Sequence, residues 1–282
     1  LACGNTVVLK PAETTSLSCL LLAEILQEAG LPDGVVNIVT GAGETGAALV
    51  SHFDVNKIAF TGSTDVGRLI LKSVAATDKK LTLELGGKSA HIVYEDAAID
   101  QAVEGVINGI FFNQGHVCCA GSRLLLEESI ADSFVDKLKN RMQKLRVGNP
   151  LDKNTDIGAI NSLTEQQKIK KLIESGKAEG GEFFEPAQLA LPTKGYFLKP
   201  CFFNKVSSAF TLSRVEVFGP VLAISTFRTT QEAIMKANDT PYGLAAGVWS
   251  EKGSKIHKTA QGLKAGVIWA NTYNKFDPTS PF

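Results

Sequence analysis

Cysteine is scarce in this sequence, and the few cysteines present do not form the patterns that disulfide-stabilised or zinc-binding proteins need. The 282 residues include five cysteines, and none of them belongs to a Cys-x-x-Cys pair. Regular cysteine frameworks are typical of small secreted domains, and closely spaced cysteine pairs are typical of structural zinc sites. The scarcity indicates a protein that folds in a reducing compartment, and we expect no metal ligands.

The sequence also lacks an excess of charge of either sign and any long apolar run. Its 29 basic residues balance its 29 acidic residues, and neither kind gathers in a block. A basic stripe is typical of a surface for nucleic acid or an anionic membrane, and a membrane-spanning helix needs about 20 apolar residues in succession. We therefore expect no nucleic-acid partner and no membrane attachment.

Enough apolar material is present for a substantial core. Hydrophobic residues make up 44% of the 282 residues, and this length predicts two domains. The chain has no initiator methionine and stops at Phe282 without a closing element, so we expect a fragment. We expect a cytoplasmic protein, and a mitochondrial one stays open because a leader could have preceded residue 1.

Short apolar runs alternate with helical patterns in the first part of the chain. Four runs predict buried strands: Val7 to Leu9, Val35 to Val39, Lys57 to Phe60 and Leu81 to Leu85. Between the first two runs, an apolar stripe at helical spacing predicts an amphipathic helix that ends near Gly30. The stripe consists of Leu17, Leu20, Leu21 and Ile25. This alternation of strand and helix predicts a parallel sheet.

A second α/β unit is predicted to start near residue 87. Its expected strands are residues 91–94, 221–227 and 267–271, and its expected helices are 98–110, 130–145, 165–175, 230–237 and 254–261. We therefore divide the chain into residues 1–86 and residues 87–282.

Two glycine-containing loops each follow a predicted strand and open a predicted helix. Residues 41–46 fit Gly-x-Gly-x-x-Gly, and Asp65 follows 19 residues later, as in dinucleotide-binding folds. Residues 60–67 offer backbone N–H groups and two hydroxyls to a phosphate. The residues alone leave open which loop binds one.

The main chemical signal is Cys118, in the polar segment that follows Asn113-Gln-Gly-His116. A loop or a helix start is favoured there over a core strand, and a helix start would favour the thiolate. Glu84 precedes Cys118 by 34 residues, and a carboxylate can activate the water that resolves an acylated thiol. A lone cysteine is more often a packing residue, so the hypothesis depends on the pair.

Both segments resemble signatures of the NAD(P)-dependent aldehyde dehydrogenase superfamily. The glutamate of Thr82-Leu-Glu-Leu-Gly-Gly-Lys88 and the cysteine of Gly115-His-Val-Cys118 have the family's separation, and the likeness runs along nearly the whole chain. The resemblance implies a variant Rossmann cofactor domain, here residues 1–86, followed by an α/β catalytic domain, here 87–282. It also implies oxidation of a small-molecule aldehyde to a carboxylic acid through a thiohemiacetal and a thioester.

The resemblance further implies a cofactor site. In the family the pyrophosphate lies at the second glycine loop, Lys10 and Glu13 match residues at the adenosine ribose, and Glu216 and Phe218 match residues at the nicotinamide end. A carboxylate at Glu13 would repel a 2′-phosphate, so NAD is expected over NADP. The implied contacts are Lys10, Glu13, Phe60, Gly62, Ser63, Gly67, Leu85, Glu216 and Phe218.

The substrate pocket and the assembly are also implied only by the resemblance. Aromatic residues wall the aldehyde tunnel in the family, and the candidates here are Phe112, Phe276 and Phe282. The family's oxyanion asparagine would fall before residue 1. A homodimer or homotetramer is expected for the full-length protein.

Three other functions stay open. A CoA-acylating semialdehyde dehydrogenase would usually lack a base at the position of Glu84, and a non-catalytic scaffold would be expected to lose Cys118. A cysteine hydrolase would need a histidine partner, for which His52, His91 and His257 are candidates. His116 would face away from Cys118 on a helix, because side chains two residues apart do not meet.

Overall fold

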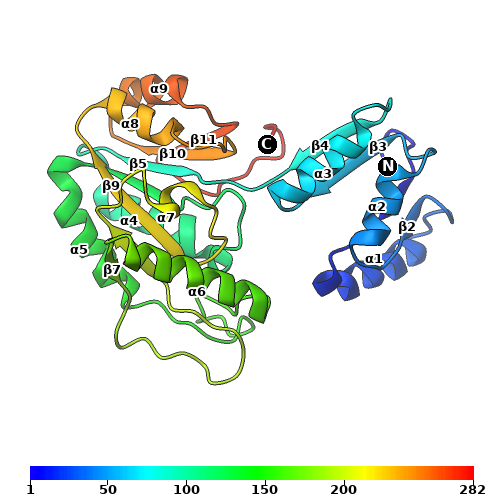
Figure 1. The fold of residues 1–282 in the computed structure, drawn as a ribbon, viewed down its shortest axis with the longest axis horizontal. Coiled ribbons are helices and arrows are strands. Elements are labelled where there is room, and N and C mark those ends of the chain that lie inside the picture. Colours follow the sequence, from blue (N-terminus) through cyan, green and yellow to red (C-terminus); the bar gives the residue numbers. More distant parts are fainter. The chain divides into compact units, whose positions relative to one another are not determined.

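The computed structural model describes residues 1–282 as two compact units, residues 1–85 and residues 86–282 (Figure 1). In both units helices and strands alternate along the chain. Each unit has hydrophobic clusters of its own. The predicted α/β fold class is therefore confirmed. None of the helices has the length and apolar character that crossing a membrane requires.

The first unit holds two separate pairs of parallel strands. Its elements are β1 (Val7–Leu9), η1 (Glu13–Thr15), α1 (Ser16–Glu28), β2 (Val36–Ile38), α2 (Gly43–Ser51), β3 (Lys57–Thr61), α3 (Thr64–Val74) and β4 (Lys80–Glu84). β1 pairs with β2, and β3 pairs with β4. All four strands form where the apolar runs predict them. The expectation of one sheet is wrong for this unit, because β2 and β3 are not hydrogen-bonded to each other.

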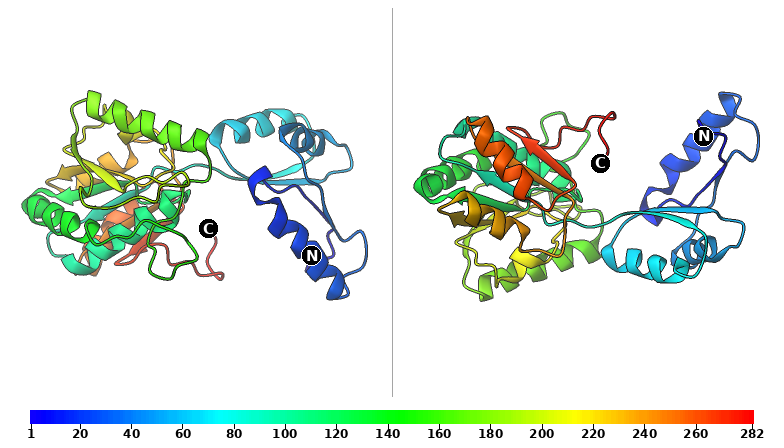
Figure 2. Two further views of the ribbon diagram at one scale, coloured as in Figure 1. Left: turned by 90° about the horizontal axis from the view of Figure 1, so that it is seen from below. Right: turned by 90° about the horizontal axis from the view of Figure 1, so that it is seen from above.

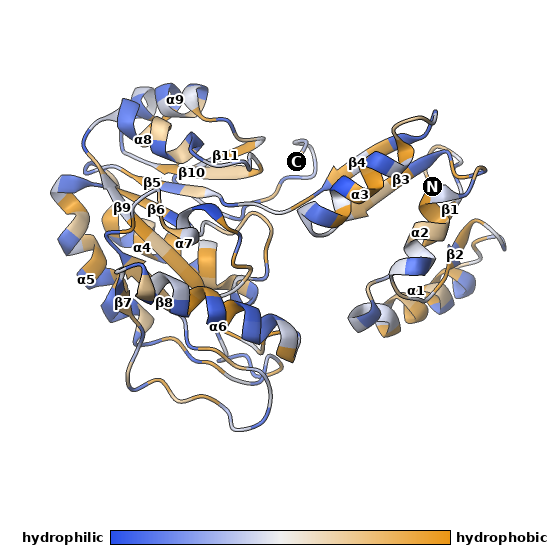
Figure 3. Ribbon diagram, viewed as in Figure 1, coloured by the Kyte–Doolittle hydropathy of each residue, from blue (hydrophilic) through white to orange (hydrophobic).

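The helix α1 forms as predicted, but its apolar stripe does not face a core. None of its residues is buried, and Leu17 is 84% exposed. Figure 3 shows hydrophobic residues along this helix. β1 and β2 contribute only three residues each, which is too little sheet surface to cover a helix of 13 residues. The buried cluster of the unit comes instead from α2, β3 and α3 and consists of Val50, Ile58, Ile70 and Val74.

The second unit is organised around a seven-stranded sheet with the order β11-β10-β5-β6-β9-β8-β7. The strands are β5 (Ala90–Val93), β6 (Arg123–Glu127), β7 (Glu182–Phe184), β8 (Cys201–Asn204), β9 (Val221–Phe227), β10 (Ala245–Trp249) and β11 (Val267–Ala270). The helices are α4 (Ile99–Phe111), η2 (Phe112–Gly115), η3 (Glu128–Ile130), α5 (Ala131–Met142), α6 (Leu163–Ala178), α7 (Thr211–Arg214), α8 (Thr230–Asn238) and α9 (Gly253–Gly262). All pairings are parallel except that of the edge strand β7 with β8.

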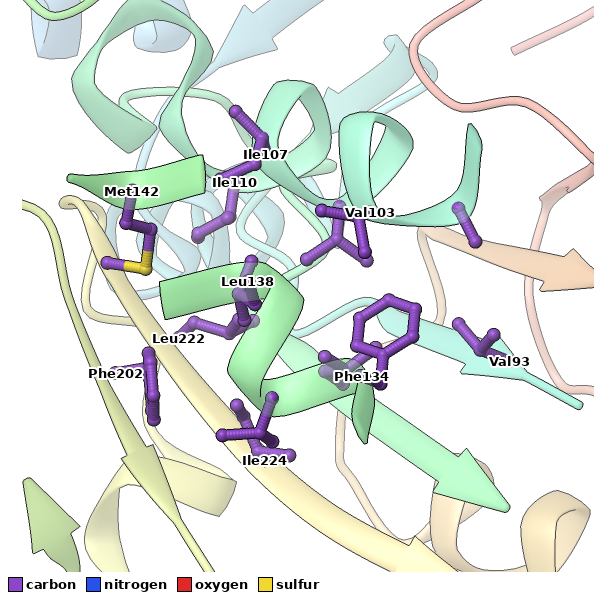
Figure 4. Packing of buried hydrophobic residues seen from close by; sticks show 14 of the residues in the cluster. Val93, Val103, Ile107, Ile110, Phe134, Leu138, Met142, Phe202, Leu222 and Ile224 are labelled. Atoms are coloured by element: carbon purple, nitrogen blue, oxygen red, sulfur yellow. The ribbon is translucent and has the colours of Figure 1, made fainter. Parts of the chain in front are cut away.

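Helices cover both faces of this sheet, as the views in Figure 2 show. Successive strand residues point to opposite faces, so neighbours on β9 enter different clusters. Leu222 and Ile224 pack with α4 and α5, whereas Val221 and Ala223 pack with α6 on the other face. α8 and α9 cover that second face over β5 and β10. The α4–α5 side forms the largest cluster, part of which Figure 4 shows.

Most predicted elements of this unit appear within a few residues of their expected bounds, and the helices α4, α5, α6, α8 and α9 all form. Four strands were not predicted from the sequence, namely β6, β7, β8 and β10. Two of them, β6 and β10, are the direct partners of β5 in the middle of the sheet.

The α4–α5 cluster yields a prediction about stability. Phe134 on α5 has 0% of its surface exposed and packs in this cluster (Figure 4). Phe134→Ala should lower the free energy of unfolding by about 3 to 5 kcal/mol, because it removes buried apolar contact and leaves a cavity. Urea unfolding of the full-length protein measures this. Asn140→Ala on the exposed side of the same helix is the control, and equal losses in both variants would contradict the assignment of the core.

Candidate active site

Cys118 lies in a turn between α4 and β6. α4 ends at Phe111, and the next residues include a run with left-handed backbone at Asn113 (φ 48°), Gln114 (φ 48°) and Gly115 (φ 77°). Two of these three are not glycine, and such backbone is costly and typical of functional sites. A tight turn follows, closed by the N–H of Ala120 on the carbonyl of Val117 at 3.0 Å. The nucleophile candidate therefore stands in a turn and not at the start of a helix.

The turn is pinned from several sides. The backbone at Gly87 comes so close that a Cβ there would lie 2.2 Å from the carbonyl oxygen of Cys118. The hydroxyl of Tyr273 donates to the carbonyl of Cys119 at 2.8 Å. The N–H of Gly121 donates to the carbonyl of Gly109 at 2.9 Å, which ties the end of the turn to α4. Cys118 itself stays partly exposed, whereas Cys119 has only 1% of its surface exposed.

The two neighbouring thiols differ in acidity. The neighbouring Cys119 thiol lowers the pKa of Cys118 to about 7, although burial and the Glu216 carboxylate oppose this. The nearby Cys118 sulfur and burial raise the pKa of Cys119. Burial also raises the pKa of Cys201. A substantial fraction of Cys118 is therefore thiolate at neutral pH, while Cys119 keeps its proton. The thiolate is the form of cysteine that attacks carbonyl carbons.

Glu216 and Phe218 line a small cavity next to this turn. The cavity is lined by Gly87, Ile110, Gly115, Val117, Ala120, Ser122, Glu216, Val217, Phe218 and Gly219. One oxygen of the Glu216 carboxylate accepts the N–H of Gly87 at 3.0 Å, and burial raises the pKa of Glu216. The structure thus brings two of the predicted cofactor residues together with Val117, the residue before Cys118.

Two buried cations beside the site were not predicted from the sequence. Lys88 is fully buried, and burial and the neighbouring Arg123 lower its pKa to about 7. The Arg123 guanidinium donates to the carbonyls of Lys88, Lys236 and Ala237 at 2.8, 2.9 and 2.6 Å. Arg123 thus joins the start of β5 to the end of α8. The only sequence signal was their position, since Lys88 closes the Leu-Glu-Leu-Gly-Gly-Lys segment and Arg123 follows Cys118 by five residues.

The histidines of the second unit do not pair with the thiol. His91 is buried, accepts the indole N–H of Trp249 and stacks on Tyr273 with ring centroids 4.6 Å apart. Burial lowers the pKa of His91 to about 3, so it is neutral. The rings of His116 and Phe218 have their centroids 5.1 Å apart. His257 lies exposed on α9. None of these rings hydrogen-bonds to Cys118, so this unit lacks the dyad of a cysteine hydrolase.

The predicted residues of the first unit form two local groups. Lys10 donates from Nζ to the carbonyl of Gly41 at 2.9 Å, so it meets the first glycine loop. Ser63 caps α3 by accepting the N–H of Val66 at 3.3 Å. In the second group, Gly62 lies against the Phe60 ring and Gly67 against the Leu85 side chain, while the carbonyl of Glu84 accepts the N–H of Gly62 at 3.0 Å. Glu13 lies exposed in η1. Glu84 belongs to this unit and Cys118 to the other.

Two of the three phenylalanines predicted for a substrate pocket lie together. The ring centroids of Phe276 and Phe282 are 5.3 Å apart, and those of Phe276 and Trp269 are 5.5 Å apart. Phe112 is 58% exposed and has no part in this group. No group of three or more His, Cys, Asp or Glu side chains is placed to hold a metal ion.

The whole chain, residues 1–282, matches the model of the aldehyde dehydrogenase family. The chain belongs to this family. It is 45% identical over 283 residues to the putative aldehyde dehydrogenase DhaS of Bacillus subtilis (strain 168), and the match covers 100% of this chain and 57% of that protein. The chain thus spans little more than half the length of such a relative.

Solved structures of aldehyde dehydrogenases share the fold. KauB from Pseudomonas aeruginosa matches with a TM-score of 0.95 and 41% identity, over 99% of this chain and 57% of that one. Indole-3-acetaldehyde dehydrogenase, solved with NAD+, matches with a TM-score of 0.95 and 41% identity, also over 99% of this chain and 57% of that one. The predicted aldehyde dehydrogenase-like fold is confirmed.

Proposed function

We propose that the protein to which this chain belongs oxidises an aldehyde to a carboxylic acid with NAD as the oxidant. The observation that carries the proposal is the partly exposed Cys118 thiol, held in a pinned turn where the neighbouring Cys119 thiol lowers its pKa to about 7. Family membership and the NAD+ bound to one solved relative support the choice of chemistry and cofactor.

Each unit by itself has residues that suit one part of the cofactor. Glu216 holds a buried carboxylate on the cavity beside the Cys118 turn, where it can accept hydrogen bonds from ribose hydroxyls. At the other end, α3 begins at Thr64 after the Ser63 cap, and a helix N-terminus favours phosphate. On these grounds we assign residues 1–86 to cofactor binding and residues 87–282, which hold the nucleophile, to catalysis, with Glu84 of the first part as the base. Bound NAD supplies the acceptor for the hydride that oxidises the aldehyde carbon.

The steps at the protein's own residues follow from the thiol. The Cys118 thiolate attacks the aldehyde carbon, and the backbone N–H of Cys118 donates to the oxygen that becomes negative. After oxidation the carbon is held as a thioester on the sulfur. Glu84 takes a proton from water, the water attacks the thioester carbon, and the carboxylic acid leaves as the Cys118 thiol is restored.

Glu84 also separates this proposal from its main alternative. A CoA-acylating enzyme transfers the acyl group of the same thioester to the thiol of CoA, so it has no need of a base at the position of Glu84. A non-catalytic scaffold has no need of the Cys118 nucleophile. The proposal further includes a small-molecule aldehyde as substrate, with Phe276 and Phe282 as pocket residues, a homodimer or homotetramer, and a cytoplasmic location.

Removal of the nucleophile tests the proposal directly. Cys118→Ala in the full-length protein should reduce aldehyde-dependent NADH formation by roughly a thousandfold or more, while NAD binding measured by calorimetry stays nearly unchanged. Cys119→Ala is the matched control and should lose much less. Equal loss in both variants would show that Cys118 is not the nucleophile.

The role of Glu84 is tested by separating the burst from turnover. Glu84→Gln should still give a burst of about one NADH per active site, because the thioester forms, but steady-state turnover should be lost, because the thioester is not hydrolysed. Stopped-flow absorbance measures both phases. Normal steady-state turnover in this variant would exclude Glu84 as the base and would revive the CoA-acylating alternative.

Cofactor preference tests the assignment of Glu13. Initial rates should be higher with NAD than with NADP, and Glu13→Gln should narrow the ratio by roughly tenfold, because the variant no longer repels the 2′-phosphate. Glu44→Gln, at the start of α2, is a control of equal charge change. A native preference for NADP would overturn the assignment.

A further inference from the structure

The turn that holds the proposed nucleophile is a β-turn from Val117 to Ala120, with Cys118 and Cys119 at its two central positions. The N–H of Ala120 closes the turn on the carbonyl of Val117 at 3.0 Å. This N–H belongs to the peptide that joins Cys119 to Ala120, and the carbonyl of the same peptide accepts the hydroxyl of Tyr273 at 2.8 Å. Both polar ends of the peptide are therefore engaged, one within the turn and one from outside it.

The series of hydrogen bonds continues to the backbone N–H of Cys118. The carbonyl of Val117, which closes the turn, belongs to the peptide whose N–H is that of Cys118. This N–H donates to no backbone carbonyl of the chain, so it stays available to an oxygen of a substrate. The series therefore runs from the Tyr273 hydroxyl through two hydrogen-bonded peptides to the free N–H of Cys118.

The ring of Tyr273 lies in a slot that three glycines keep open. An added Cβ would lie 2.6 Å from the ring at Gly247 on β10, and 3.2 Å from it at Gly109 on α4 and at Gly121. The ring also stacks on His91, with ring centroids 4.6 Å apart, and Tyr273 has only 2% of its surface exposed. Several elements of the unit thus fix the direction in which the hydroxyl points.

The segment that carries Tyr273 also holds the side chain of Cys119. Burial raises the pKa of the Tyr273 phenol, so the hydroxyl stays a neutral donor. The next residue, Asn274, accepts the Cys119 thiol on Oδ1 at 3.6 Å. Cys119 is buried, so bulk water does not reach its carbonyl to replace the hydroxyl. Because a buried carbonyl without a donor is strongly disfavoured, loss of the hydroxyl would let this peptide rotate and draw the N–H of Ala120 away from Val117.

We propose that Tyr273 is a positioning residue that holds and polarises the Cys118 N–H through these two peptides. The inference rests on the proposed function, in which that N–H donates to the substrate oxygen that becomes negative. A carbonyl that accepts a hydrogen bond draws electron density from its own amide, which makes the N–H of that amide a stronger donor. Donation from Tyr273 therefore strengthens the N–H of Ala120, and the bond from Ala120 in turn strengthens the N–H of Cys118.

Two reactions of Cys118 in the full-length protein separate the N–H donor from the thiol. The thiolate attacks the ester carbon of para-nitrophenyl acetate through an intermediate with a negative oxygen, and nitrophenolate leaves with the bonding electrons. The same thiolate displaces iodide from the CH₂ carbon of iodoacetamide, and no oxygen gains charge. Nitrophenolate absorbance gives the first rate and peptide mass spectrometry the second. Rates in Cys118→Ala are subtracted as background.

Tyr273→Phe keeps the ring and removes only the hydroxyl. Its acylation rate should fall roughly tenfold, which is less than the roughly 10² to 10³ that loss of a direct oxyanion donor costs. Its alkylation rate should change by less than about twofold, because that reaction forms no oxyanion and the close approach of Gly87 still places Cys118. An equal fall in both rates would assign the effect to the placement of the thiol and would overturn the proposal. An unchanged acylation rate would overturn it as well.

Tyr94→Phe is the matched control. The Tyr94 hydroxyl is also buried and lies 2.7 Å from the Thr259 hydroxyl, with no bond to the Cys118 turn. Both rates should equal those of the native protein in this variant, although a buried hydroxyl is lost as in Tyr273→Phe. Thermal unfolding compares the stability of the two variants. A fall in acylation as large as that of Tyr273→Phe would show a general loosening of the unit and would overturn the proposal.

A second change at Tyr273 keeps the test decisive where Tyr273→Phe does not fold. Site-specific replacement of Tyr273 by a tyrosine with fluorine next to the hydroxyl keeps the hydrogen bond and makes its donor more acidic. Because a more acidic hydroxyl donates more strongly, the ratio of the acylation rate to the alkylation rate should equal or exceed that of the native protein. A lower ratio would contradict the proposed polarisation.

Neither reaction needs NAD or turnover, so the two hypotheses can fail separately. If Cys118→Ala remains active as a dehydrogenase, the proposed function fails whatever these rates are. If Cys118→Ala is inactive and the ratio of acylation to alkylation is the same in Tyr273→Phe as in the native protein, only the role of Tyr273 fails.

Discussion

The chemistry proposed for this chain depends on how closely two stretches of backbone approach each other at Gly87. Any side chain at this position would place its Cβ 2.2 Å from the Cys118 carbonyl oxygen, far inside the closest approach of two non-bonded atoms. The same residue donates its N–H to Glu216. One glycine therefore sets both the position of the thiol and that of the carboxylate that lines the adjoining cavity. The remaining contacts of the turn, at Tyr273 and Gly121, refine a placement that this approach already limits.

Periodicity along the chain was enough to place most of the fold. β9 is a strand of seven residues that opens with four apolar ones, Val221 to Ile224, and α4 and α5 carry apolar residues at helical spacing. β10 escaped prediction because its residues, Ala-Ala-Gly-Val-Trp, include three with weak strand preference. It forms a strand because β5 and β11 hydrogen-bond to it on both sides. Helix α1 shows the opposite case. Its apolar spacing predicts the helix correctly, but the spacing does not show whether another part of the chain covers the apolar side.

Short sequence motifs predicted part of the candidate site, and the other residues were recognised only from their contacts in the folded structure. Glu216 and Phe218 were predicted from one short motif, and the structure places them on one cavity beside the Cys118 turn. Cys119, Tyr273 and Asn274 were not predicted, because their roles arise from contacts across more than 150 residues. Lys88 and Arg123 were missed for a related reason. A buried cation is recognised by its surroundings, here three backbone carbonyls around Arg123, and not by its neighbours in sequence.

The bond between Tyr273 and the Cys119 carbonyl has a consequence for biosynthesis. A ribosome delivers Cys119 first and reaches Tyr273 only 154 residues later. At about 5 to 20 residues per second, the turn therefore exists for several seconds or longer without its clamp. The backbone beside Cys118 thus gains one of the hydrogen bonds that hold it in the folded protein only after the last strand of the sheet has been made.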